Sequence, residues 1–351
     1  MSTGLSTGMH TERDILAAGL ATLVRRLLPR ASGITGLQRL SAGATLQTWS
    51  FDAVGDAGFL HPLILRRSPG GLRGAESLAL PLEAALIRAL AGSNATLATV
   101  VPEVVHTLGP DDALGDGFLM TRVAGETIPR KIQRDEAFAA ARPRLVAQMG
   151  TALAAIHRAD TTTLPALPVR STAATLANLQ RRNHALPQPS AVFEFALRWL
   201  HQHQPADPPT LRLVHGDFRL GNLIVGGGPD GGLRTVLDWE IAHLGDPAED
   251  LAWICLPPWR FGQIHQPVAG LGQRDELFRA WQQASGEAVD PARVRWWQAL
   301  GSLRWGLGCA GMRDWFDSGR DATVERAMIA RRVSENELDL LRLLCEETAD
   351  A

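Results

Sequence analysis

Polar side chains suited to holding a metal ion and a phosphate group are concentrated in one stretch, Leu211–Trp253. Asp217, Asn222 and Asp238 supply oxygen atoms there, and Arg219 supplies a positive charge. Mg²⁺ prefers hard oxygen ligands of this kind and commonly holds a phosphate group at the same time. The residue types therefore indicate a site for a phosphate group bound through magnesium.

Two short strands are expected to position these side chains. Leu223–Val225 and Leu233–Leu237 are apolar runs, and the glycine-rich Gly226–Gly232 between them cannot continue a strand. The runs are therefore predicted to fold back as a β-hairpin. Asn222, directly before the first strand, and Asp238, directly after the second, then lie side by side at its open end.

The spacing of these residues matches the skeleton of a kinase catalytic centre. The string HGDFRLGN places Asp217 five residues before Asn222, and Asp238 follows the hairpin in the string LDWE. In protein kinases the first aspartate accepts the hydroxyl proton, while the asparagine and the later aspartate hold Mg²⁺. The spacing therefore predicts phosphoryl transfer.

Two other interpretations of the stretch compete with this one. Asx-rich turns between strands are common and often carry only turn chemistry. A His-Gly-Asp string with a later Gly-Asn also occurs in metallophosphoesterases, which need further histidine and aspartate ligands. No histidine follows Asn222 before His243, and the agreement of several signals favours the kinase interpretation.

The individual letters give a closer resemblance. Gly216 and the Asp-Trp-Glu after the hairpin differ from protein kinases and resemble the aminoglycoside phosphotransferase family of small-molecule kinases. The continuation AHLGDPAEDLAW resembles the branch that is fused to acyl-CoA dehydrogenase domains in some eukaryotes. The resemblance covers about residues 38–345. It implies an α+β, protein-kinase-like two-lobe fold, with a small antiparallel-sheet N-terminal lobe and a larger, mainly helical C-terminal lobe.

Composition agrees with a two-lobed globular protein. The chain has 351 residues, 45% hydrophobic and 21% charged, with a formal net charge of −2. That length is sufficient for two cores. The small net charge gives no electrostatic reason to expect nucleic acid or a membrane as partner. Nothing in the composition predicts an oligomeric state.

Cysteine use and the N-terminus indicate the cellular compartment. Cys255, Cys309 and Cys345 are far apart and have no metal-ligand spacing, so reduced thiols are expected. The first residues lack the apolar core of a signal peptide, and no apolar run reaches membrane-spanning length. A cytoplasmic location is predicted.

Three segments are predicted along the chain. Residues 1–10 are small and polar and are expected to be disordered. Residues 11–123 form the nucleotide-binding lobe, beginning with an amphipathic helix at Thr11–Leu28. Residues 124–351 form the lobe with the catalytic hairpin and the helical substrate-binding region, in which Asp135–Arg158 and Thr323–Glu347 are each predicted to be one helix. Five strands are predicted to make the antiparallel sheet of the first lobe: Leu37–Leu40, Gln47–Phe51, Pro62–Arg67, Val101–Leu108 and Gly117–Val123.

The resemblance implies two nucleotide contacts on loops of the first lobe. After the first strand, small residues let backbone N–H groups approach the phosphates; they are Ser41, Gly43, Ala44 and Thr45. After the fifth strand lies the segment that recognises adenine, with Met120 against the base and Val123 beside it. A core methionine is the ordinary alternative for Met120.

Arg66 stands where kinases place the lysine that holds the α- and β-phosphates. Arginine also binds phosphate, through a two-pronged guanidinium. Adjacent strand residues point to opposite faces, so Arg66 and Arg67 cannot share this role. The expected helix partner is Glu83, with Glu76 as a competitor in a segment predicted to be loop.

These residues define a predicted reaction. The γ-phosphoryl group of ATP, or alternatively GTP, passes to a hydroxyl group of a small molecule. Asp217 orients and deprotonates that hydroxyl, Arg219 neutralises phosphate charge, and Asn222 and Asp238 hold Mg²⁺. Positioning and electrostatics supply most of the rate.

Two further residues are expected to support the catalytic turn. His215 begins the turn and is assigned a structural role. Asp246-Pro247 is a helix-start signal, which puts Asp250 in the first helical turn, and the resemblance implies that Asp250 braces the catalytic turn. A surface acid favoured by the helix dipole is the alternative.

The acceptor is less defined than the donor. The C-terminal region mixes Asp314 and Asp317 with Arg304, Arg313 and Arg320, so it is not the acidic pocket that cationic aminoglycosides need. The branch resemblance implies a hydroxyacyl-type metabolite. The alternative function is a nucleotide-binding pseudokinase with a regulatory or scaffolding role.

Overall fold

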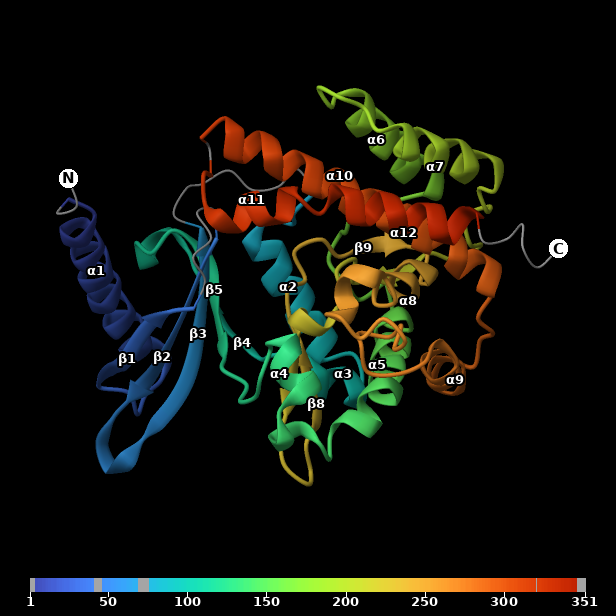
Figure 1. Ribbon diagram of the computed structural model, residues 1–351. Coiled ribbons are helices and arrows are strands. Elements are labelled where there is room, and N and C mark those ends of the chain that lie inside the picture. Colours follow the sequence, from blue (N-terminus) through green and yellow to red (C-terminus); the bar gives the residue numbers. More distant parts are fainter. Residues whose placement is uncertain (1–3, 41–45, 69–75, 320, 346–351) are drawn as a thin grey trace. The chain divides into compact units, whose positions relative to one another are not determined.

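The computed structural model describes residues 4–40, 46–68, 76–319 and 321–345, with side chains from residue 12 onward (Figure 1). The chain divides into two compact units. The first comprises Met1–Gly125, Thr162–Ala166 and Arg234–Ile241; the second comprises Glu126–Thr161, Leu167–Leu233 and Ala242–Ala351. None of the described helices has the length and apolar character needed to cross a membrane.

The first unit is built on a five-stranded antiparallel sheet, which confirms the predicted architecture. Its strand order is β1-β2-β3-β5-β4, and every neighbouring pair runs antiparallel. The sheet is visible in Figure 1 in blue and teal. The strands are β1 (Gly33–Arg39), β2 (Gln47–Val54), β3 (Leu60–Ser68), β4 (Val104–Thr107) and β5 (Asp116–Thr121).

One face of this sheet packs against α1 (Gly4–Leu27). Leu16 and Leu20 of the helix share a buried apolar cluster with Leu63 and Leu65 of β3. Burial of these side chains removes apolar surface from water and fixes the helix on the sheet. The helix begins at Gly4 rather than Thr11, so residues 4–10, which were predicted to be disordered, are helical. A nucleated helix propagates more easily than it starts.

The other face of the sheet lies toward α2 (Leu80–Ala91), which contacts β4 and β5. A short helix that the sequence analysis did not predict, α3 (Ala95–Val100), follows. Asn94 caps it by accepting a hydrogen bond from the Leu97 N–H at 2.9 Å. The cap offsets the weak helix preference of its threonine and valine residues.

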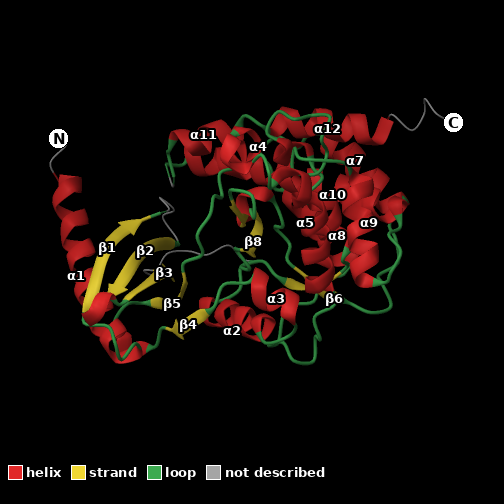
Figure 2. Cartoon of the chain, turned by 90° about the horizontal axis from the view of Figure 1, so that it is seen from below, coloured by secondary structure: helices red, strands yellow, loops and turns green. Residues whose placement is uncertain are grey.

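The second unit is mainly helical, and α10 (Pro291–Asp317) is its longest helix in the described residues. This helix packs against α8, α11 and α12, while α5 packs against α9 (Figure 2). The other helices of the unit are α4 (Pro129–Arg134), α5 (Arg142–His157), α6 (Thr172–His184), α7 (Ala191–Gln202), α8 (Ala248–Trp253), α9 (Arg274–Ser285), α11 (Val324–Ala330) and α12 (Val333–Cys345).

Two predicted helices are interrupted in the structure. The stretch expected to be one helix at Asp135–Arg158 contains a short 3₁₀ segment, Glu136–Phe138, before α5. Pro143 at the start of α5 disfavours helical continuation before it. The stretch Thr323–Glu347 breaks between α11 and α12, where the Arg332 N–H turns back to the Ile329 carbonyl at 2.9 Å.

The catalytic stretch forms short strands. In the second unit β6 (Arg212–Val214) pairs antiparallel with β9 (His243–Gly245). A 3₁₀ turn, Leu220–Asn222, then leads into β7 (Leu223–Gly226). This strand and β8 (Gly232–Val236) form the predicted two-stranded sheet.

Candidate active site

In the second unit, Asp217 lies on the turn after β6 with its carboxylate held by three side chains. Trp253 donates its indole N–H to Oδ1 at 2.8 Å, and Asn222 donates its amide to Oδ2 at 2.7 Å. The Nε of Arg219 lies 3.1 Å from both oxygens. The side chain is still 20% exposed. The carboxylate is thus fixed in orientation and open to a reacting group.

Asn222 orders the turn as well as the carboxylate. Its side-chain nitrogen also donates to the backbone carbonyl of Asp217 at 2.9 Å. Both contacts use the nitrogen, and the amide oxygen accepts no hydrogen bond from the described residues. An amide oxygen that accepts no hydrogen bond from the described residues can coordinate a cation.

Asp250 lies buried beneath the same turn. Its carboxylate accepts the backbone N–H groups of His215 and Gly216 at 2.8 and 2.9 Å, and it lies 3.1 Å from His157 Nε2. Trp281 donates to the other nitrogen of His157 at 3.0 Å. Burial alone would raise the pKa of Asp250, but the bond and charge of His157, and the charge of His215, hold it below its ordinary value. This geometry is what bracing of the turn requires.

A second buried carboxylate, Glu249, reaches the turn through Arg304. Arg304 donates to Glu249 at 2.7 Å and to the Gly216 carbonyl at 2.8 Å, and its guanidinium lies 3.9 Å from the Trp253 ring centroid. His243 lies 3.2 Å from Glu249 on the other side. Against the effect of burial, His243 and Arg304 lower the pKa of Glu249 to about 2. The arginine therefore ties the turn to a helix carboxylate that remains ionised.

In the first unit, Arg66 is surrounded by three carboxylates. It lies 3.4 Å from Glu83, 2.5 Å from Asp238 and 3.2 Å from Glu240. Burial alone would lower the pKa of Arg66, but the charges of Glu83, Asp238 and Glu240 raise it above the ordinary value. Asp238 has a positive φ of 69°, an uncommon backbone conformation for a residue other than glycine. We call these four residues the Arg66 cluster.

Arg67 lies on the opposite face of β3, as strand alternation predicts. It donates to Gln47 at 2.9 Å and to Glu12 of α1 at 2.7 Å. Leu63 and Leu65 share this face. Arg67 therefore helps to join α1 to the sheet, and its neighbour Arg66 contacts Glu83 of α2 on the other face.

The structure describes two of the other residues predicted to bind the nucleotide, Met120 and Val123. Met120 is buried and pairs with Ile64 across β3 and β5, so it shares the sheet face of Arg66. Val123 follows the end of β5. Ser41, Gly43, Ala44 and Thr45 lie outside the described residues.

Of the predicted metal ligands, Asn222 belongs to the second unit and Asp238 belongs to the first. In the described part of the chain, no group of three or more His, Cys, Asp or Glu side chains is placed to hold a metal ion. Such a closed protein cage is not needed for Mg²⁺ in phosphoryl transfer, where one or two protein oxygens and the substrate phosphates suffice. The oxygens of Asn222 and Asp238 fit that chemistry.

Three contacts to the site were not predicted from the sequence. Glu240 follows Asp238 in the LDWE string and could have been chosen as a partner for the arginine. Trp253 is 36 residues from Asp217, and Arg304 is 88 residues from Gly216. No spacing signal links them to the turn, so these two contacts required the fold.

The comparison with protein families gives one match that covers most of the chain. Residues 36–297 match the model described as the phosphotransferase enzyme family. Among curated proteins, mouse acyl-CoA dehydrogenase family member 10 is 30% identical over 207 residues, which make up 55% of this chain and 18% of the mouse protein. The chain thus spans less than a fifth of that relative.

Solved structures share the fold. A putative aminoglycoside phosphotransferase from Ralstonia eutropha superimposes with a TM-score of 0.69 at 19% identity, covering 93% of this chain and 97% of the other. A thermostable mutant of aminoglycoside phosphotransferase APH(4)-Ia, in a ternary complex with AMP-PNP and hygromycin B, has a TM-score of 0.61 at 17% identity, covering 92% and 99%. At these identities the likeness establishes the kinase-like architecture.

Proposed function

Because the chain belongs to the phosphotransferase enzyme family, we propose that it transfers the γ-phosphoryl group of ATP to a hydroxyl group of a small molecule. The observation that carries the proposal is the Asp217 carboxylate, which is oriented by Trp253, Asn222 and Arg219 and remains partly exposed. A general base must be held in this way while staying within reach of the acceptor hydroxyl.

Each residue of the turn has a proposed part in the reaction. Asp217 accepts the proton of the acceptor hydroxyl as the oxygen–phosphorus bond forms. Arg219, which also contacts the Trp259 ring at 5.2 Å, exchanges its bond to Asp217 for the transferring phosphate. Asp250 and His215 keep the turn in place. Catalysis then depends on positioning the reactants and on placing positive charge where negative charge develops in the transition state.

The nucleotide is proposed to be held by Arg66, Glu83 and Asp238. Arg66 donates to phosphate oxygens, and Glu83 keeps the arginine in position through their 3.4 Å ion pair. Asn222 and Asp238 would each give an oxygen atom to Mg²⁺, which supplies neutralisation of the phosphate charge. ATP is favoured as the donor because a related structure contains AMP-PNP; GTP is the alternative.

The acceptor is proposed to be a hydroxyacyl-type metabolite. Support comes from the similarity to a region of acyl-CoA dehydrogenase family member 10, a protein named for acyl substrates. Solved relatives include a complex with hygromycin B. In this chain Arg219 and Arg304 neutralise the carboxylates of Asp217 and Glu249 at the turn, which weakens the attraction of these carboxylates for a cationic antibiotic.

The test is ATP consumption with a panel of hydroxylated small molecules, compared between the wild-type protein and Asp217→Asn. The panel contains hydroxy acids, their thioesters and aminoglycosides. Turnover that requires one hydroxylated compound and is lost in Asp217→Asn supports the proposal. Equal turnover by both proteins would remove the assignment of Asp217 as base.

One observation favours a second function. Arg66 replaces the usual lysine and is paired with Asp238 itself, so the proposed metal ligand is engaged by a protein cation. A pseudokinase that binds nucleotide without turnover fits this arrangement. Thermal stabilisation by ATP and Mg²⁺ with no turnover on any panel compound would establish this alternative over the kinase.

A further inference from the structure

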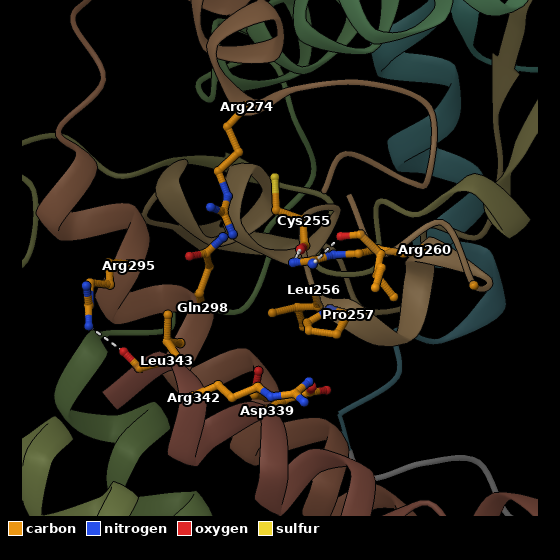
Figure 3. Close-up of a pocket in the computed structure, with 13 residues that line it drawn as sticks. Cys255, Leu256, Pro257, Arg260, Arg274, Arg295, Gln298, Asp339, Arg342 and Leu343 are labelled. Atoms are coloured by element: carbon orange, nitrogen blue, oxygen red, sulfur yellow. Dashed lines mark hydrogen bonds between the residues drawn. The ribbon is translucent and has the colours of Figure 1, made fainter. Parts of the chain in front are cut away.

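A cavity of about 730 Å³ in the second unit is lined by four arginines and one acidic residue, all within the described part of the chain. The arginines are Arg260, Arg274, Arg295 and Arg342, and the acid is Asp339. We call this the arginine cavity (Figure 3). Its volume lies in the range that small-molecule sites occupy.

The arginines reach the cavity from separate elements. Arg260 follows α8 on a short 3₁₀ turn, Pro257–Arg260, and Arg274 begins α9. Arg295 belongs to α10, and Arg342 belongs to α12. Since α10 packs against α12, the packing of helices holds the charges together rather than one flexible segment.

The partners of Arg260 and Arg274 in the described residues include neutral groups. Arg260 donates to the carbonyls of Cys255 and Ile264 at 2.9 and 3.2 Å. With its amide oriented to accept, Gln298 takes two hydrogen bonds of 3.2 Å from Arg274. Figure 3 shows Arg274 extending toward Gln298 and Arg260 toward Cys255. These contacts orient the groups and leave their positive charge in place.

Asp339 is the acidic side chain among the described residues that line the cavity. Within the described residues, Arg260, Arg274 and Arg342 form no ion pair, and the Nε of Arg260 is buried without a hydrogen-bond partner. Burial, and then the positive charge of Arg274, lower the pKa of Arg260. Like charges repel, and an anion placed among them replaces repulsion with attraction.

We propose that the arginine cavity binds a small polyanion, a metabolite carrying two or more carboxylate or phosphate groups. Guanidinium groups recognise both kinds of group through paired hydrogen bonds. The outer donors of Arg260 and Arg342 would contact the anion, while Gln298 keeps Arg274 in position. The residues that line the cavity do not include Asp217, Arg219 or Asn222, and the proposal is independent of phosphoryl transfer.

The test is calorimetric titration with citrate, in the absence of metal and nucleotide, at about pH 7.5. Trimethyl citrate, which has the same skeleton without the charges, is the ligand control. Arg342→Gln is the main variant because Arg342 is exposed and its side chain forms no hydrogen bond in the described residues. Arg181→Gln, an equal charge change on exposed Arg181 of α6, is the matched control.

Citrate is expected to bind the wild type and trimethyl citrate is not. Arg342→Gln is expected to weaken citrate binding about tenfold, as loss of one charged contact does; Arg342→Lys should recover part of it, and Arg181→Gln should change nothing. The proposal is overturned if citrate does not bind, if trimethyl citrate binds equally well, or if both glutamine variants lose the same affinity.

A measurement on the unmodified sequence tests the location independently. Phenylglyoxal labels accessible arginines, and peptide mapping identifies which are labelled. Citrate is expected to protect Arg342 and leave Arg181 reactive. Labelling of Arg342 that citrate leaves unchanged would place the anion elsewhere and refute the site.

Discussion

Two regions of the molecule place arginine in opposite electrostatic surroundings. In the Arg66 cluster one guanidinium faces three carboxylates, from Glu83, Asp238 and Glu240. In the arginine cavity, Arg260, Arg274 and Arg342 form no ion pair within the described residues, and Asp339 is the acidic side chain of the described lining. The same side chain is therefore over-neutralised in one place and under-neutralised in the other.

The difference indicates what each region can bind. Three carboxylates around one arginine carry an excess negative charge, which suits a divalent cation arriving with phosphate. Arg260, Arg274 and Arg342, with one carboxylate in the described lining, carry an excess positive charge, which suits an anion by itself. The residue type alone does not identify the ligand, whereas the balance of its neighbours does.

The largest effect is expected from Asp217→Asn, which should impair catalysis without changing ligand binding at the Arg66 cluster or at the arginine cavity. The change should lower kcat by roughly 10²–10⁴-fold, the usual contribution of a general base. Asparagine has the same shape, so ATP·Mg²⁺ affinity, citrate affinity and melting temperature should barely change. The measurement is turnover on the best acceptor beside the two affinities.

The control for this prediction is Asn222→Asp, which keeps an oxygen ligand but loses the amide that donates to Asp217. Asn222→Asp should mainly change how turnover depends on the Mg²⁺ concentration. An Asp217→Asn protein that loses nucleotide binding in step with turnover would make Asp217 a metal or structural residue.

The sequence predicted the fold well where the signal comes from residues close together in the chain. Alternation in β3 assigned Leu63 and Leu65 to one face and Arg66 to the other, and the structure has them so. The helix α3 was not predicted, because its threonine- and valine-containing sequence has weak helical preference. The breaks near Glu136 and Arg331 were also missed, since apolar periodicity continues across them.

The site was predicted where its residues are close in sequence. Asp217 and Asn222 were predicted to lie at one site, and in the structure the Asn222 amide donates to Asp217 at 2.7 Å. Trp253 and Arg304 reach the turn through tertiary packing of α8 and α10. The arginine cavity was missed for the same reason: its charges come from four elements separated along the chain.

The next largest effect is expected from Asp238→Ala, which tests whether the Arg66 cluster serves a metal ion. Losing one oxygen ligand should weaken ATP·Mg²⁺ binding by roughly 100-fold, at the upper end of what supporting groups of a metal site contribute. Calorimetry with and without Mg²⁺ measures it. Metal-free ATP affinity serves as the control and should change little; unchanged affinity for ATP·Mg²⁺ would refute the metal role.

A smaller effect is expected from Arg66→Ala, which should raise the nucleotide KM about tenfold through loss of a charged contact to phosphate. Arg67→Ala is the matched control. Because Arg67 donates to Gln47 and Glu12 on the other face, its loss should lower the melting temperature and leave KM unchanged. Steady-state kinetics and thermal unfolding separate the two. A larger KM change at Arg67 would mean that the phosphate contact lies on the face of α1.

The smallest effect, and the finest test of the charge comparison, concerns Asp339 in the arginine cavity. Burial raises the pKa of Asp339 to about 6. The positive charges of Arg260, Arg342 and Arg332 oppose this rise, and the negative charge of Glu335 adds to it. The group is therefore ionised above about pH 6 and neutral below it. An ionised Asp339 competes with an anion for the arginines, so anion affinity should increase as pH falls through about 6.

Ethanedisulfonate is the suitable ligand because its charge stays constant over that pH range. In the wild type its affinity should increase several-fold from about pH 7.5 to about pH 5.5, a modest change because one carboxylate near the surface contributes about 1 kcal/mol or less. Asp339→Asn should bind it more tightly at the higher pH and show a flatter profile. The mutant differs by one oxygen replaced with nitrogen, so packing is conserved. If Asp339→Asn kept the steep pH dependence of anion affinity seen in the wild type, the titrating group would be another residue. If Asp339→Asn bound the anion less tightly than the wild type, Asp339 would support the arginines instead of competing for them.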